Sequence, residues 1–198
     1  MSVSKLSNSL VRAAWISLLV LLSACQSRTL LPTQPLPSSV EALHNWNLSG
    51  RIGYRAGNDG GSASLDWRQR HLDGEMRFSG PVGIGSARLF WSPRSVTLDT
   101  GKEQFEAASS AELAWRLTGL WLPVEALQFW VRGLPWPDSH WQEQRNEQGQ
   151  LEQLEQLGWQ LHFSDYRQIE QLSLPQKIRA SQQDQRFTLM IRNWEPLP

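Results

Sequence analysis

Apolar and polar side chains alternate along most of the segment from residue 48 to residue 99. A period of two places every second side chain on the same face of a β-strand, and polar partners indicate that the other face meets water. Turn sequences at residues 58–61 and 100–101 punctuate the pattern. It predicts antiparallel strands whose apolar positions are Leu48, Ile52, Tyr54, Ala63, Leu65, Trp67, Met76, Phe78, Ala87, Leu89, Trp91, Val96 and Leu98.

The alternation then gives way to two helical segments. Ser109 followed by Glu112 forms a capping box, and Gly119 fits the end of that helix. Pro123 fits the first turn of a second helix, which ends before Gly133. Apolar side chains cover nearly every side of these segments: Leu120, Trp121, Leu122, Val124, Leu127, Phe129, Trp130, Val131 and Leu134. Such helices need a second apolar surface to pack on, and we expect this to be the apolar face of the sheet.

The rest of the chain predicts further strands and one more helix. A capping box at Ser38 and Glu41 predicts a short helix over residues 39–45. A turn is expected near residues 146–149. Leucine at every third position of residues 151–157 fits a helix or a bulged strand, and we favour the strand because glycines bound the segment closely. Alternation resumes at Trp159, Leu161, Phe163, Ile178, Ala180, Phe187, Leu189 and Ile191.

Together these elements predict one antiparallel sheet of roughly ten strands with two helices beside it. A sheet of that size tends to curl, and more than about eight strands leave room for a ligand inside the curve. The fold class expected from the pattern is therefore mainly β, a cup with a helical lid.

The N-terminus carries the features of a bacterial lipoprotein signal. Lys5 and Arg12 precede an apolar run over residues 13–22, which is too short to span a bilayer of roughly 30 Å. Leu22-Ser23-Ala24-Cys25 follows and resembles a lipobox, in which the cysteine thiol is acylated and the chain is cut just before it. The alternative is an ordinary secretory signal with an incidental cysteine, which would leave an unpaired thiol in an oxidising compartment.

This interpretation divides the chain into three parts. Residues 1–24 are the signal peptide, residues 25–37 are the lipidated Cys25 with a Pro-rich tether, and residues 38–198 are a single domain. Gln26 follows the cysteine, and in proteobacterial lipoproteins an Asp at that position commonly marks inner-membrane retention. The outer membrane is therefore the expected location.

Composition and motifs argue against several functions. Removing Lys5 and Arg12 with the signal changes 19 basic against 19 acidic residues to 17 against 19, without a basic block, so nucleic-acid binding is not expected. His44, His71, His140 and His162 share no metal-ligand spacing. Neither a phosphate-binding loop nor a G-x-S-x-G elbow is present. We expect no metal, no cofactor and no enzymatic activity.

The loop over residues 80–85 presents two aliphatic residues, Val82 and Ile84, where turns normally expose polar ones. They can fold back onto the sheet edge, or they can form an exposed tip that dips into a membrane. Composition alone favours the first interpretation.

Several segments together resemble the LolB family of outer-membrane lipoprotein receptors. The resemblance rests on Leu48-Ser49-Gly50-Arg51-Ile52-Gly53, Ser79-Gly80-Pro81-Val82-Gly83, Leu122-Pro123-Val124, Trp130-Val131-Arg132-Gly133-Leu134-Pro135 and Asn193-Trp194. It implies an unclosed β-barrel of eleven strands with an α-helical lid over a hydrophobic cavity, a fold shared with the periplasmic carrier LolA. It also implies that the protein accepts lipoproteins from that carrier and inserts their acyl chains into the inner leaflet of the outer membrane.

The resemblance assigns expected roles to particular residues. An exposed leucine at the family's loop tip aligns with Val82, which now favours membrane contact by Val82 and Ile84. The alternative function is an outer-membrane lipoprotein that binds another amphiphile or serves a structural role; in either case we expect a monomer. The expected acyl-chain cavity residues are Ile52, Tyr54, Leu65, Trp67, Met76, Phe78, Leu89, Trp91, Leu98, Leu161, Phe163 and Leu189. The expected lid residues are Leu113, Leu117, Leu127, Phe129, Trp130 and Val131.

Overall fold

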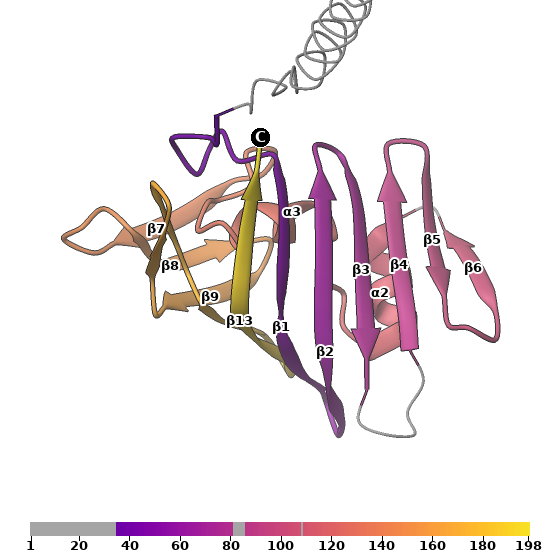
Figure 1. Ribbon diagram of the computed structural model, residues 1–198. Coiled ribbons are helices and arrows are strands. Elements are labelled where there is room, and N and C mark those ends of the chain that lie inside the picture. The colour runs from indigo at the N-terminus through magenta and orange to yellow at the C-terminus, as the bar shows by residue number, and fades with distance from the viewer. Residues whose placement is uncertain (1–34, 81–85, 108) are drawn as a thin grey trace, which may run out of the picture. The chain divides into compact units, whose positions relative to one another are not determined.

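The computed structural model describes residues 35–80, 86–107 and 109–198, which are built around one large antiparallel sheet (Figure 1). The sheet has eleven strands in the order β6-β5-β4-β3-β2-β1-β13-β12-β9-β8-β7, and β10 and β11 form a separate ribbon. Because the order ends at β6 and β7 without pairing them, the sheet is unclosed. This confirms the predicted fold class. The strands are β1 (Asn45–Ala56), β2 (Asp59–Arg70), β3 (Asp73–Ser79), β4 (Ser86–Ser92), β5 (Ser95–Asp99), β6 (Gln104–Ala107), β7 (Trp141–Arg145), β8 (Leu151–Gln156), β9 (Trp159–Ser164), β10 (Arg167–Ile169), β11 (Leu172–Leu174), β12 (Lys177–Gln182) and β13 (Gln185–Leu197).

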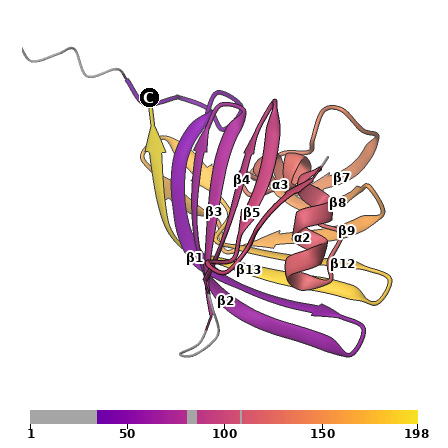
Figure 2. The same cartoon turned by 90° about the vertical axis from the view of Figure 1, so that its right-hand side faces the viewer.

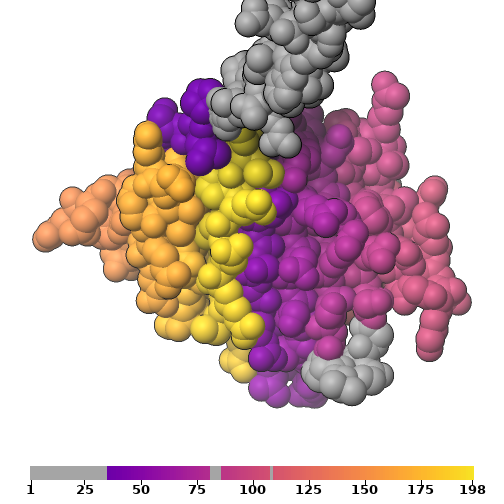
Figure 3. Space-filling view, in the orientation of Figure 1, coloured from indigo at the N-terminus to yellow at the C-terminus, as the bar shows by residue number. Residues whose placement is uncertain are grey.

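The pairing of β1 with β13 joins the first and last strands of the chain in the middle of the sheet. They run side by side across the outer face in the space-filling view (Figure 3). The register shifts between Ser49 and Gly50. At Gly50 a Cβ atom would lie 2.2 Å from the backbone oxygen of Met190, so only glycine allows this close approach.

Two helices, α2 (Ser110–Thr118) and α3 (Val124–Trp130), lie within the concave side of the sheet (Figure 2). The Ser109 Oγ accepts a hydrogen bond from the Glu112 amide at 3.3 Å, which confirms the capping box. Gly119 ends α2 in a left-handed conformation with φ 73°, as predicted. In the part of the chain that the structure describes, neither helix is long and apolar enough to cross a membrane.

The helix predicted over residues 39–45 is wrong. The Ser39 Oγ accepts from the Ala42 amide at 3.4 Å and the Leu43 amide donates to the Val40 carbonyl at 3.3 Å, but the turn does not continue. Asn45 already pairs with both β2 and β13. Seven residues cannot offset the cost of helix nucleation against a strand with two partners.

The strands expected from alternation are confirmed, but four further strands were not predicted. Residues 151–156 form β8, the favoured alternative, and Leu157 occupies the following turn with φ 54°. Strands β6, β7, β10 and β11 were not predicted. Strands β6 and β7 are the two edges of the eleven-stranded sheet, and β10 and β11 form the separate ribbon.

A cluster of tryptophans fills the concave side at one end of the sheet. The Trp46 ring centroid lies 4.8 Å from that of Trp67 and 5.1 Å from that of Trp194, and Trp67 lies 5.7 Å from Trp91, all in edge-to-face contact. The Trp67 Nε1 donates to the buried Gln69 Oε1 at 3.0 Å. These rings account for part of the high tryptophan content.

We predict that alanine substitutions at two strand glycines change the free energy of unfolding by different amounts. At Gly74 an added Cβ would lie 1.9 Å from Trp91 Cζ2, whereas at Gly53 no atom lies within 4 Å. Because the Trp91 ring is buried and cannot move aside freely, Gly74→Ala should lower the free energy of unfolding by about 1–3 kcal/mol. Gly53→Ala should change it by less than about 1 kcal/mol. Urea unfolding measures both, and equal midpoints for the two variants would contradict the packing described for Trp91.

Candidate functional site

An apolar cavity of about 160 Å³ lies between the concave face of the sheet and the helices α2 and α3. Among the described residues that line it none is charged, and the polar side chains are limited to Tyr54, Ser62 and Thr118. The Thr118 hydroxyl is already engaged, because it donates to the Ala114 carbonyl at 2.7 Å. The site therefore suits an apolar ligand and offers little to a charged one.

Many of the residues expected in the cavity line it, but not all. Ile52, Tyr54, Leu65, Met76, Phe78, Leu89, Leu98 and Leu189 line the cavity from the sheet, and Leu113, Leu117 and Leu127 line it from the helices. The expected residues that do not line it are Trp67, Trp91, Leu161, Phe163, Phe129, Trp130 and Val131. Cys25, Val82 and Ile84 lie outside the described residues.

Except for Phe129, which is half-buried beneath the Arg132 guanidinium, the expected residues that miss the cavity belong to filled parts of the interior. Trp67 and Trp91 are in the tryptophan cluster, and Leu161 and Phe163 are buried on β9 in the other half of the sheet. Trp130 and Val131 are fully buried. Alternation identifies which face a side chain is on, but it does not indicate where along that face the interior is hollow.

Further lining residues were not among the expected ones. They are Ser62, Ala63, Gly80, Ala87, Ala114, Thr118, Leu122, Val124 and Phe187. Most are small, and small side chains leave the space that the cavity occupies. Ala114 and Thr118 follow Leu113 and Leu117 by one position, so the helical period of α2 is the signal that identifies them.

Helix α3 is fixed to the sheet through the side chain of Gln156, which is 1% exposed. The Trp130 Nε1 donates to Gln156 Oε1 at 2.8 Å, and the Trp136 amide donates to the same oxygen at 2.9 Å. The Gln156 Nε2 donates to the Trp136 carbonyl at 2.6 Å. Because these groups are buried, breaking the network would leave several of them without partners.

Arg132 ties the end of the same helical segment to the N-terminal part of the body. Its Nη1 donates to the carbonyls of Leu43 at 2.8 Å and Val40 at 3.1 Å, and its guanidinium lies 4.9 Å from the centre of the Phe129 ring. Burial lowers the pKa of Arg132 to about 10, against a weaker opposite effect of Glu41. The group thus stays charged at neutral pH and holds these carbonyls.

Helix α2 is held by fewer polar contacts. The Ser110 hydroxyl donates to Glu125 Oε1 at 2.5 Å, which links α2 to α3. The pair of Arg116 with Glu112, at 3.1 Å, lies on the helix surface and contributes little. Besides these, the Arg116 guanidinium lies 5.5 Å from the centre of the Phe105 ring on β6, and Leu113, Ala114 and Leu117 make apolar contacts on the cavity side. Of the two helices that cover the cavity, α2 has the fewer hydrogen bonds to the sheet.

The described residues contain no cluster of three or more His, Cys, Asp or Glu side chains that could hold a metal ion.

Replacing Gln156 tests how α3 is fixed. Gln156→Leu leaves the Trp130 and Trp136 N–H groups without their acceptor, so we expect the free energy of unfolding to fall by about 2 kcal/mol or more. Gln153, exposed on the same strand, is the matched control, and Gln153→Leu should change stability by no more than about 0.5 kcal/mol. Coincident denaturation curves for the two variants would show that the network does not fix the helix.

Two solved structures share this arrangement at low sequence identity. A DUF1329 family protein from Desulfovibrio piger superposes with a TM-score of 0.56 at 10% identity, covering 79% of this chain and 87% of that one. A LolA superfamily protein from Nitrosomonas europaea superposes with a TM-score of 0.55 at 10% identity, covering 82% of this chain and 92% of that one. These similarities concern the fold.

Sequence comparisons identify the family. The outer-membrane lipoprotein LolB of Stutzerimonas stutzeri is 41% identical over 160 residues, covering 80% of this chain and 78% of the relative. The outer-membrane lipoprotein LolB of Ectopseudomonas mendocina is 37% identical over 191 residues, covering 91% and 94%. The family model described as outer membrane lipoprotein LolB matches residues 44–194. With its unclosed sheet and covered apolar cavity, the chain belongs to the LolB family.

Proposed function

We propose that this protein is an outer-membrane receptor for lipoproteins, which takes their acyl chains into the cavity and inserts them into the inner leaflet. The observation that carries the proposal is the uncharged cavity under α2 and α3. Membership of the LolB family, the lipobox at Cys25 and the fold shared with a LolA superfamily protein support it. The donor would be a LolA-like periplasmic carrier, and the protein would act without a nucleotide, a cofactor or chemical catalysis.

The energetics of acyl chains require such a cavity. Burying a methylene group contributes about 0.8 kcal/mol, so exposing a chain of about sixteen carbons to water costs roughly 12 kcal/mol. A lipoprotein with several chains cannot cross an aqueous gap freely. Transfer therefore runs from one apolar cavity to another and then into lipid, each step driven by a modest difference in affinity.

The cavity as described is too small for such a ligand. A cavity of roughly 150 Å³ holds a molecule the size of benzene, and this one measures about 160 Å³. An acyl chain therefore needs the cover to move. Since α3 is fixed through Trp130 and Gln156 while α2 is linked through Ser110, α2 is the part that opens.

Competition for the cavity tests this proposal. A triacylated peptide should displace a hydrophobic fluorophore from the purified protein. Leu117→Asn places an amide in the lining and should weaken peptide binding roughly tenfold. Leu72→Asn, at a position 66% exposed and outside the lining, should bind as the unmodified protein does. Displacement by other amphiphiles but not by the peptide would indicate a different ligand, and no displacement at all would favour a structural role.

Delivery to the membrane is tested separately. From the sequence resemblance, Val82 and Ile84 contact the bilayer. Val82→Glu should therefore leave peptide binding intact and abolish insertion of a bound lipoprotein into vesicles, because a charge opposes entry into lipid. Val82→Leu, which carries the family's residue, should insert at least as well as the unmodified protein. Full delivery by Val82→Glu would refute the role of the loop.

A further inference from the structure

Trp115 and Trp121 form a stacked pair on the outside of the helical cover. Their ring centroids are 5.6 Å apart with an interplanar angle of 22°. Trp115 is 46% exposed and Trp121 is 50% exposed, whereas Trp46, Trp67, Trp130 and Trp159 are fully buried. Two large, half-exposed aromatic rings that stack on each other form an apolar surface patch, and such patches mark interaction sites.

The pair lies beside two β-hairpin ends. The Trp121 amide donates to Gln185 Oε1 at 3.2 Å, and Gln185 is opposite Ala56 in the pairing of β13 with β1. A Cβ atom on Gly119 would contact Ala56 at 3.4 Å. The aromatic pair is therefore next to the β1–β2 and β12–β13 turns, at the lower end of the sheet in Figure 1.

Two arginines form the next residue pair along β1 and β13, beside the pair of Ala56 and Gln185. Arg55 on β1 is directly opposite Arg186 on β13, and both are exposed. Like charges at opposed positions are unfavourable unless an anion lies between them. Among the described residues neither arginine forms an ion pair, although Asp59 and Asp184 lie in the same hairpins. A groove lined by both arginines and by glycines leaves room for such an anion.

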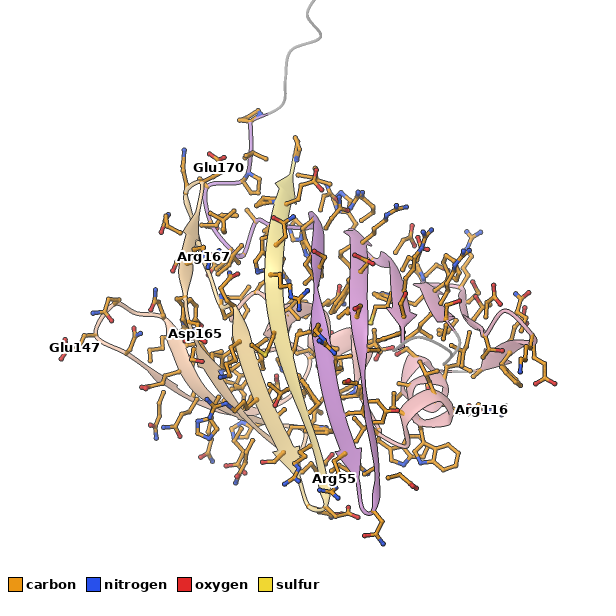
Figure 4. All side chains as sticks on the ribbon, turned by 60° about the horizontal axis from the view of Figure 1, so that its bottom comes forward. Arg55, Arg116, Glu147, Asp165, Arg167 and Glu170 are labelled. Carbon is orange, nitrogen blue, oxygen red and sulfur yellow. The ribbon has the colours of Figure 1, made fainter. Side chains whose placement is uncertain are left out.

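Other features place this patch relative to the cavity. Leu117 and Leu122 lie within two residues of Trp115 and Trp121 in the sequence, and both leucines line the cavity. Figure 4 brings this end of the molecule forward and shows Arg55 on β1 and Arg116 on α2 projecting outward there. Aromatic rings with a polar N–H, next to cations, are typical of the boundary between lipid headgroups and acyl chains.

We infer that this end of the body docks on a phospholipid bilayer, with Trp115 and Trp121 at the headgroup boundary and Arg55 and Arg186 beside lipid phosphates. The anionic surface is the occupant that the arginine pair favours, because a second copy in a symmetric contact would bring like charges together. The residues that make this contact are other than Val82 and Ile84. It does not depend on which apolar ligand the cavity takes.

Quenching by brominated lipid tests this contact. The lipidated protein is reconstituted in vesicles of phosphatidylethanolamine and phosphatidylglycerol that contain phosphatidylcholine brominated in its acyl chains. We expect part of the tryptophan fluorescence to be quenched, and the Trp115→Phe, Trp121→Phe double variant to lose that quenching. None of the described residues that line the cavity is a tryptophan, so the signal reports docking rather than ligand binding.

Trp141 provides the matched control, because it is 38% exposed but lies on the edge strand β7. Trp141→Phe should retain the quenching. Absence of quenching in the unmodified protein, or equal quenching in the double variant, would overturn the inference. An Arg55→Gln, Arg186→Gln variant should dock less on these anionic vesicles than the unmodified protein and equally on vesicles of phosphatidylcholine alone. Unchanged docking on the anionic vesicles would overturn the role given to the arginines.

Discussion

An open sheet of eleven strands must cover its concave apolar face, and the rest of this structure depends on that requirement. The two edge strands, β6 and β7, do not pair with each other, so the sheet does not close over this face. It is covered instead by the segment containing α2 and α3, which is apolar on nearly every side. A cover that comes from outside the sheet can be attached firmly in one place and loosely in another.

The interior uses both kinds of attachment. Around Trp46 and Trp130 large rings fill the space, and the hydrogen bonds of Gln156 and Arg132 hold α3 and its C-terminal end in place. Beneath α2 the lining includes many small side chains, and a cavity remains. Filled parts of the core stabilise the fold, while the hollow part loses contacts that a ligand can restore. The same sheet thereby supports a stable body and a binding site.

The sequence predicts mainly those elements whose side chains follow a regular pattern of buried and exposed positions. Longer strands with one buried face alternate and were found, whereas β6 and β11 are too short for the pattern to stand out, and every residue of β7 is exposed, so that edge strand carries no period-two signal. Cavity-lining and packed positions were also hard to separate, because Leu65 and Trp67 share a face and only Leu65 lines the cavity. The turn at Ser39 has the local features of a helix start, but the double pairing of β1 overrides it. Which local structure forms at such a position depends on pairing with residues that are distant in the chain.

Hydrogen exchange of backbone amides, with and without a triacylated peptide, tests most directly whether α2 is the part of the cover that opens. Weakly attached elements exchange through low-energy openings, whereas firmly packed ones exchange slowly. We expect faster exchange in residues 110–118 than in residues 124–130, and a change on peptide binding in the first segment with little change in the second. Peptide binding that leaves α2 unchanged, or that opens α3, would contradict this expectation.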